Sequence, residues 1–170
     1  KQVVGDPTDE RTQIGPLIRP SEVERVESWV EEARSKGAKV CCGGFRLGPT
    51  TYAPTVLLNP ADEARVSKLE VFGPVVCVYT YQKLDEAILR ANNVPFAFQA
   101  AVFTRELDTA MYAYQRLNAT AVMVNDHTAF RVDWMPFGGL KHSGIGVGGI
   151  PYSIHELLVD KLLVLRSSGL

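Results

Sequence analysis

The sequence predicts an α/β domain with a largely parallel sheet and flanking helices. Two observations support this prediction. Helix-like amphipathic stretches alternate along the chain with short β-branched runs, and the run Val75–Tyr79 is apolar at successive positions, as in a strand covered on both faces. Ligands of such sheets bind beyond the carboxyl ends of the strands, which directs attention to the residues after Val124.

The first helix is expected to begin at Ser21, because Glu24 stands three residues later and completes a capping box. Gly37 is the expected left-handed residue after its end. The apolar face of this helix repeats at helical spacing and comprises Val23, Val26, Val30 and Ala33.

Five short strands are expected where apolar and β-branched residues cluster between turn residues, over 39–42, 52–58, 75–79, 100–103 and 121–124. A second helix over 84–91 ends at Asn92. Thr104 is expected to cap the third helix. The apolar stripe of that helix comprises Leu107, Ala110, Met111, Tyr114 and Leu117.

Residues 125–149 show no periodicity and hold one proline and six glycines. A long unpatterned loop in a compact domain is typically functional or disordered, and its aromatic residues argue against disorder. Pro151 is expected to start a short last helix. Lys161–Leu165 then follows as a terminal strand, whose apolar edge needs a cover such as a partner subunit.

The composition excludes several classes of protein. Eighteen Lys and Arg against nineteen Asp and Glu give a net charge of -1, which provides no basic surface for nucleic acid. No apolar run approaches the roughly 18 residues of a membrane helix, and no signal peptide is visible. Three cysteines are an odd number, which favours a reducing cytoplasm over a disulfide framework. The chain begins at Lys1 and not at a methionine, as a processed product, an expressed piece or a fragment of a longer protein would.

An acid and an aromatic residue stand two positions apart in Glu70–Pro74, before a Gly-Pro turn. Glu70 and Phe72 can therefore project toward one ligand. The alternatives are a solvated glutamate and a core phenylalanine, and the spacing alone favours these. In the later loop, Arg131 has three interpretations: it clamps an anion, stacks on an aromatic ring or pairs with Asp133.

Other motifs carry less weight. Gly144–Gly149 matches G-x-G-x-x-G but lacks the parallel strand-loop-helix unit that a dinucleotide fingerprint requires. The three histidines have no metal-ligand spacing, so no metal site is expected. Cys77 lies in an apolar strand and is expected to be an inert buried thiol.

Together these residues resemble the aldehyde dehydrogenase superfamily along nearly the whole chain. The specific part of the resemblance is the pair of motifs acid-x-Phe-Gly-Pro and Pro-Phe-Gly-Gly-x-Lys-x-Ser-Gly, in this order and at this separation. The matching segments are Val4–Pro7, Ile14–Leu17, Glu70–Pro74, Asp85–Ile88, Ala91–Asn92, Val124–Asn125, Pro136–Gly139, Lys141, Ser143 and Gly144.

The resemblance implies oxidation of a small-molecule aldehyde to an acid with NAD or NADP, through a cysteine thiohemiacetal and a thioester that water hydrolyses. Glu70 resembles the acid that binds the hydroxyls of the nicotinamide ribose, and Phe72 the residue packed near the nicotinamide. Asn125 resembles a loop-ordering residue. The residues that resemble the substrate tunnel are Phe130, Arg131, Trp134 and Phe137. The terminal strand resembles the one that joins subunits, which implies a homo-oligomer.

The resemblance places the nucleophile, the general base, the oxyanion asparagine and the main dinucleotide-binding domain upstream of this chain. We therefore expect residues 1–158 to be the C-terminal part of a catalytic domain and residues 159–170 to be an oligomerisation strand and tail, without dehydrogenase activity on their own. Phe96–Gln99 departs from the family's Tyr-Gly-Leu pattern, whereas Phe130–Asp133 is of the type seen in relatives that act on small polar or anionic aldehydes. The alternatives are a non-catalytic oligomerisation or binding module and a CoA-acylating relative.

Overall fold

The computed structural model describes residues 2–169, which fall into two compact units. Unit 1 is Lys1–Ala87 and unit 2 is Ile88–Leu170, with Lys1 and Leu170 outside the described residues. Both units combine helices with short strands, so the predicted α/β class is confirmed. Within residues 2–169, the strands form a three-stranded sheet in unit 1 and two strand pairs in unit 2.

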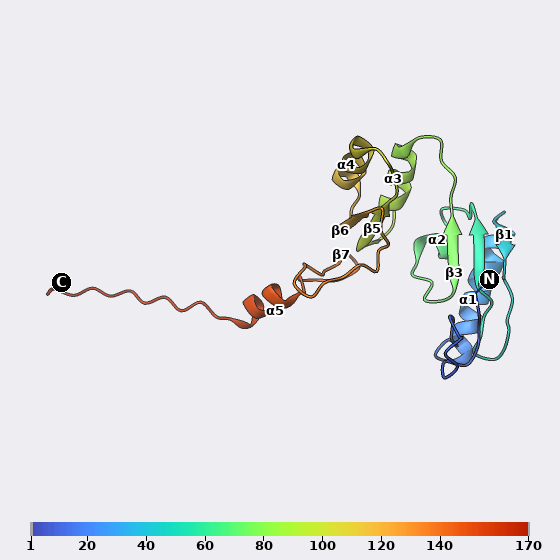
Figure 1. Ribbon diagram of the computed structural model, residues 1–170, viewed down its shortest axis with the longest axis horizontal. Helices are drawn as coiled ribbons and strands as arrows, with labels where there is room; N and C mark the ends of the chain where they lie inside the picture. The colour runs from blue at the N-terminus through green and yellow to red at the C-terminus, as the bar shows by residue number, and fades with distance from the viewer. Residues whose placement is uncertain (1, 170) are drawn as a thin grey trace. The chain divides into compact units, whose positions relative to one another are not determined.

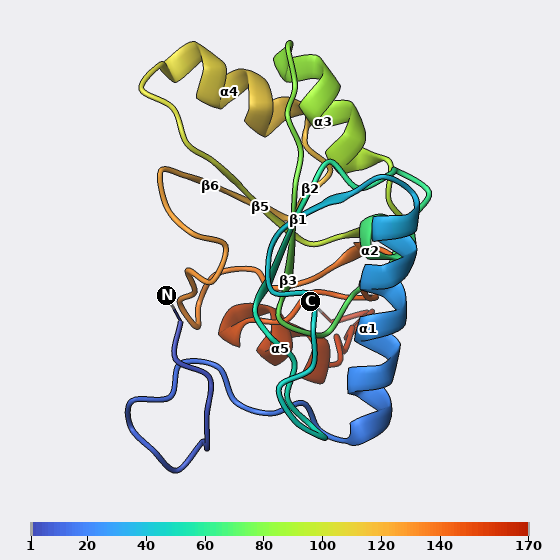
Figure 2. The ribbon, with the colours of Figure 1, turned by 90° about the vertical axis from the view of Figure 1, so that its right-hand side faces the viewer.

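Unit 1 contains a three-stranded sheet with helix α1 (Pro20–Ser35) against it (Figures 1 and 2). The strand order is β1-β2-β3. β1 (Lys39–Cys42) is antiparallel to β2 (Thr55–Leu58), and β2 is parallel to β3 (Val75–Val78). The short helix α2 (Arg65–Lys68) lies in the crossover between the two parallel strands.

The core of unit 1 forms between α1 and this sheet. The apolar face predicted for the first helix is buried as expected, because its valines recur every three or four residues. Buried core residues from both sides are Val23, Val26, Trp29, Val30, Ala33, Ala38, Tyr52, Leu57, Ala64 and Val66.

The predicted capping box of α1 is wrong. The helix begins at Pro20, and its N-cap residue is Arg19, whose side chain makes no capping hydrogen bond. Proline fits the first helical position because its fixed φ suits the helix, and it holds the preceding residue extended. Ser21 therefore lies inside the helix. The end of the helix matches the prediction, with Gly37 at a φ of +94°.

The expected coverage of β3 on both faces is wrong within the described chain. Its side chains alternate between half-buried and exposed, and Val76 and Val78 are exposed. The strand therefore has one face against the core and one open face, which is the usual pattern of a half-buried strand.

Unit 2 contains two separate strand pairs (Figure 1). β5 (Gln99–Val102) is parallel to β6 (Ala121–Val124), with helix α4 (Leu107–Arg116) as the crossover between them. β4 (Phe96–Ala97) is antiparallel to β7 (Leu140–Lys141). The remaining helices are α3 (Leu84–Asn92), which runs across the boundary of the two units, and α5 (Ile150–Leu157).

The apolar stripe predicted on α4 is buried only in part. Ala110 and Ala113 are buried, whereas Leu107, Met111 and Tyr114 are exposed. The helix uses its small side chains for close packing, so the larger apolar residues lie on the open face. Thr104 also does not cap this helix: its N-cap is Glu106, whose backbone N–H donates to Thr104 Oγ1 at 3.1 Å.

Residues 159–169 contain no strand, so the strand predicted over Lys161–Leu165 is not formed within this chain. A strand requires a neighbour for its backbone hydrogen bonds, and this segment runs on extended and exposed after α5 (Figure 1). In the part of the chain that the structure describes, no helix has both the length and the apolar character needed to cross a lipid bilayer.

Candidate functional site

The loop between α2 and β3 presents Glu70 and Phe72 to solvent. Both side chains are exposed, Phe72 to 77 %, while Val71 between them packs against the core of unit 1. The alternative of a core phenylalanine is therefore wrong for Phe72, whereas the exposed Glu70 is compatible with a solvated glutamate. Within residues 2–169, the Glu70 carboxylate makes no hydrogen bond or ion pair, so both of its oxygens are available as acceptors.

Phe72 adopts a left-handed backbone conformation with a φ of +48°. This region is uncommon for a residue with a bulky side chain and persists only where neighbouring contacts enforce it. One such contact involves the next residue, because a Cβ at Gly73 would lie 2.8 Å from Val26 Cγ2 on α1. Glycine therefore lets the loop approach the helix closely.

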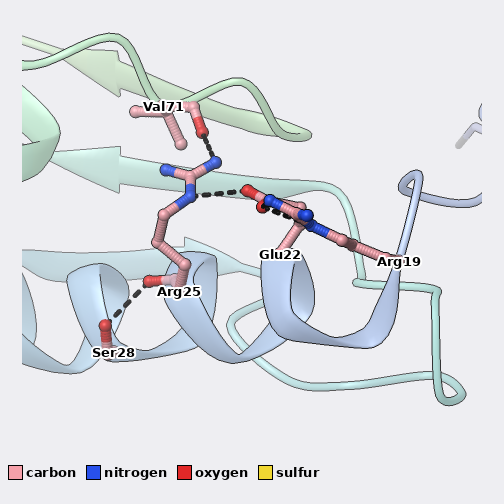
Figure 3. A network of polar contacts seen from close by, with 5 residues as sticks. All are labelled: Arg19, Glu22, Arg25, Ser28 and Val71. Atoms are coloured by element: carbon pink, nitrogen blue, oxygen red, sulfur yellow. Dashed lines mark hydrogen bonds and ion pairs between the residues drawn. The ribbon is translucent and has the colours of Figure 1, made fainter.

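Backbone and side-chain hydrogen bonds hold this loop on both sides of Phe72. The Pro74 carbonyl accepts a bond from the Thr55 N–H at 2.8 Å, which begins the parallel pairing of β2 and β3. The Val71 carbonyl accepts a bond from Arg25 Nη2 at 2.7 Å (Figure 3). The loop is therefore a fixed support for two outward side chains.

The second candidate segment, residues 125–149 of unit 2, begins at Asn125 with a φ of +59°. Its side-chain amide binds the backbone of Thr104 twice, because Nδ2 donates to the Thr104 carbonyl at 2.9 Å and Oδ1 accepts from the Thr104 N–H at 2.9 Å. The Asn125 N–H also donates to the Val102 carbonyl at 2.8 Å. These bonds fix where the chain leaves β6.

Arg131 and Phe137 meet within this segment. The guanidinium carbon lies 3.9 Å from the centroid of the Phe137 ring, and this ring also packs edge-on against Phe98 at 4.9 Å. Of the three interpretations of Arg131, the structure shows the aromatic stack. The described residues contain no ion pair of Arg131 with Asp133. Stacking leaves the edge of a guanidinium group able to donate hydrogen bonds.

The other two aromatic residues of the segment, Phe130 and Trp134, are exposed. All four predicted tunnel residues thus lie on one loop of unit 2, and Arg131 and Phe137 are in direct contact. Glu70 and Phe72 belong to unit 1.

Sequence reasoning gave Lys141 and Ser143 only as parts of a motif and missed what they contact. Lys141 Nζ donates to the carbonyls of Asn92 and Val94 at 2.7 and 3.0 Å, and Ser143 Oγ accepts from the Ala97 N–H at 3.0 Å. These side chains anchor the glycine-rich end of the loop to the end of α3 and to β4. Residue spacing in the sequence does not predict that a side chain binds backbone atoms almost fifty residues away.

Within residues 2–169, Cys77 is unsuited to act as a nucleophile and the described side chains form no metal site. Burial raises the pKa of the Cys77 thiol, which disfavours the reactive thiolate. Cys41 and Cys42 are exposed and unbridged. Within residues 2–169, no group of three or more histidine, cysteine or acidic residues could hold a metal ion.

A family model described as "Aldehyde dehydrogenase family" matches residues 1–163. The 3-sulfolactaldehyde dehydrogenase of Priestia aryabhattai is 46 % identical over 166 residues, which are 98 % of this chain and 35 % of that protein.

Two solved structures are also similar. Aldehyde dehydrogenase 21 from Physcomitrella patens, in complex with the reaction product succinate, superposes with a TM-score of 0.92 at 40 % identity and covers 99 % of this chain and 35 % of its own. Glyceraldehyde-3-phosphate dehydrogenase from Methanocaldococcus jannaschii, complexed with NADP, has a TM-score of 0.85 at 35 % identity, over 91 % of this chain and 33 % of its own. The chain spans about a third of the length of these relatives.

Proposed function

The chain belongs to the aldehyde dehydrogenase family, and from this premise we propose that it forms one part of an enzyme that oxidises an aldehyde to a carboxylic acid with NAD or NADP. The observation that carries the proposal is the fixed loop of unit 1, which holds an acid and an aromatic ring outward on either side of a half-buried valine, Val71. Membership of the family indicates which ligand these two side chains would bind, namely the NAD or NADP cofactor.

Glu70 and Phe72 are proposed to bind the nicotinamide half of the cofactor. A carboxylate with two available oxygens accepts hydrogen bonds from two ribose hydroxyls, and the exposed ring of Phe72 limits where the nicotinamide can lie. The cofactor, when bound, accepts the hydride of the oxidation. Glu70 and Phe72 orient it and take no part in the bond changes.

Residues 130–137 are proposed to line the path of a small polar or anionic aldehyde. Arg131 supplies a positive charge, and its stack on Phe137 holds the guanidinium in place so that its remaining N–H groups can meet an anionic group. Two of the similar proteins support this substrate class, since one is named for 3-sulfolactaldehyde and the other binds succinate. Phe130, Trp134 and Phe137 would exclude water from the path.

The nucleophile is proposed to be a cysteine of the remaining part of the protein. Its thiolate attacks the aldehyde carbon, hydride leaves the resulting thiohemiacetal, and water hydrolyses the thioester to the acid. The Cys77 thiol, with its raised pKa, is unsuited to this role.

Two further proposals concern assembly and location. The apolar residues of the extended terminal segment, Leu162–Leu165, are all exposed, and we propose that a second copy of the protein pairs with this segment to form a homo-oligomer. The free cysteines favour a cytoplasmic location, where thiols stay reduced.

The test uses the full-length product of the natural gene, a set of aldehydes and both cofactors. We expect NAD(P)H formation, with kcat/KM for succinate semialdehyde well above that for butanal, which has the same carbon chain without the carboxylate. Arg131→Gln is expected to reduce this preference about tenfold or more, and Glu70→Gln to weaken cofactor binding.

The products separate the alternatives. Release of the free acid without coenzyme A supports the proposal, whereas an acyl-CoA product formed only with coenzyme A identifies an acylating enzyme. A pure full-length protein that neither binds NAD(P)+ nor oxidises any of the aldehydes is a non-catalytic module, and the proposal is then wrong.

A further inference from the structure

Arg25 on α1 binds the backbone between the two residues proposed to contact the cofactor. Its Nη2 donates to the Val71 carbonyl at 2.7 Å, across 46 residues of sequence. Figure 3 shows the guanidinium pointing from the helix toward this carbonyl. The contact lies wholly within unit 1.

The guanidinium group itself is held in place by its neighbours. Its Nε donates to Glu22 Oε2 at 2.8 Å, and its central carbon lies 4.7 Å from the centroid of the Trp29 ring. Glu22 Oε1 accepts two further bonds from Arg19. The hydrogen bonds from Arg25 and then from Arg19 lower the pKa of Glu22, so this carboxylate stays charged.

The Val71 carbonyl belongs to the same peptide plane as the Phe72 N–H. Because a peptide unit is planar, fixing this carbonyl also fixes the direction of the following N–H, which restricts the φ of Phe72. That φ is +48°, a conformation that a phenylalanine adopts only under constraint. Arg25 therefore acts at the peptide whose orientation sets the unusual backbone of Phe72.

The same peptide also links the two outward side chains. Glu70 and Phe72 stand one residue on either side of Val71, whose half-buried side chain packs against the core. A rotation of the 71–72 peptide changes the ψ of Val71 and the φ of Phe72, so the chain before this peptide, which carries Glu70, turns relative to the Phe72 side chain. Downstream, the close approach of Gly73 to Val26 also holds the loop.

We infer that Arg25 is a positioning residue for cofactor binding, which holds Glu70 and Phe72 in their binding arrangement through the Val71 carbonyl. This inference rests on the proposed function, since it assumes that these two residues bind NAD(P). The proposed role of Arg25 is indirect: it binds the loop and contacts neither the cofactor nor the reacting atoms.

The test compares four variants of the full-length protein: Arg25→Gln, Arg25→Lys, Glu70→Gln and the control Arg34→Gln. Arg34 also makes an ion pair on α1, with Glu31 at 2.7 Å, but it makes no hydrogen bond to the 69–74 loop. Binding of NAD+ and NADP+ is measured by titration calorimetry, the KM of cofactor and aldehyde by steady-state kinetics, and stability by thermal unfolding.

Arg25→Gln is expected to weaken cofactor binding about five- to tenfold, because a charged hydrogen bond to the loop is lost. The KM of the aldehyde should change little. Arg25→Lys should recover part of the loss, since lysine keeps the charge and one donor. Arg34→Gln should leave cofactor binding unchanged. Equal cofactor affinity in Arg25→Gln and Arg34→Gln would overturn the inference, whatever their thermal stabilities.

A double-mutant cycle separates this inference from the proposed function. If Arg25 acts through the loop, Arg25→Gln should weaken binding clearly less in a Glu70→Gln background than alone, by at most about threefold. Fully additive effects show that Arg25 acts elsewhere and contradict the inference. If Glu70→Gln itself leaves cofactor affinity unchanged, the proposed role of Glu70 fails, which is a different result from a failure at Arg25.

Discussion

Unit 1 and unit 2 support their candidate residues in different ways. In unit 1, the Glu70–Pro74 loop lies against a core of large side chains that extends from α1 to β2. In unit 2, the buried apolar residues are fewer and smaller, namely Ile88, Ala97, Ala110, Ala113 and Met123. Its loop is held by hydrogen bonds that Asn125 and Lys141 donate and that Ser143 accepts.

The difference indicates which kind of contact each region depends on. A loop that rests on a packed core is sensitive to volume, because a lost or added methyl group changes the packing beneath it. A loop held by side-chain bonds to backbone atoms is sensitive to the loss of single polar groups. Substitutions of each kind, placed in both units, test this contrast.

The largest effect is expected from Leu57→Ala in β2. Leu57 is fully buried at 0 % exposure, so its truncation should lower the free energy of unfolding by about 2–5 kcal/mol. The matched control is Leu89→Ala on α3, where the leucine is 71 % exposed and the change should stay within about 0.5 kcal/mol. Urea unfolding of both variants measures the difference, and equal losses would contradict the contrast.

Gly73→Ala should have the next largest effect. The added Cβ would lie 2.8 Å from Val26 Cγ2, so the loop must move away from α1 at a cost of about 1–3 kcal/mol. Cofactor affinity of the full-length protein should fall with it. Gly48→Ala is the control, because its Cβ would meet nothing closer than Thr51 Oγ1 at 3.8 Å. A Gly73→Ala protein with unchanged affinity and stability would show that the close approach does not matter.

Lys141→Met tests the polar support in unit 2. It removes the two bonds to the Asn92 and Val94 carbonyls, and we expect a local loss of about 1–2 kcal/mol, since the lysine is exposed and partly screened. Hydrogen exchange at the His142 amide, which donates to the Pro95 carbonyl, should become faster. Lys161→Met in the extended tail should leave this amide unaffected, and equal exchange in the two variants would contradict the anchoring role.

The smallest effect is expected in the pH dependence of the free energy of unfolding. Hydrogen bonds from Lys36 and Arg65 lower the pKa of Glu32 from 4.5 to about 2. A carboxyl with a lowered pKa in the folded state stabilises the fold above its unfolded pKa, and this contribution is lost as the pH falls from about 4.5 through about 2. Glu32→Gln should therefore flatten the acid side of the stability profile, measured by urea unfolding between these pH values. Glu63→Gln serves as the control, and a profile that changes equally in both variants would contradict the assignment to Glu32.

The sequence was sufficient for most elements, because periodicity and turn residues act locally. The α1 face, the short strands and the left-handed Gly37 all follow from neighbours within a few residues. Predictions that depended on distant contacts were less successful. Which face of α4 is buried depends on what packs against the helix. The buried residues Ala110 and Ala113 are small, so the apolar pattern of the sequence did not single them out.

The candidate site divides in the same way. Glu70 and Phe72 were named from a motif, and their exposure agrees with a binding role that spacing alone did not favour. The hydrogen bond from Arg25 to the Val71 carbonyl was not predicted. Every residue has a backbone carbonyl, so the sequence does not distinguish the one that accepts. Contacts of side chains with distant backbone can be found only once the chain is folded.

The position of Trp29 between two arginines has a spectroscopic consequence. Its buried indole lies 4.7 Å from the Arg25 guanidinium carbon and 5.5 Å from that of Arg65. The electric field of nearby cations shifts the emission of an indole, so the colour of Trp29 fluorescence reports whether Arg25 is in place. The other tryptophan of residues 1–170, Trp134, is exposed, and its replacement by phenylalanine would leave Trp29 as the tryptophan that reports on Arg25 in this part of the protein.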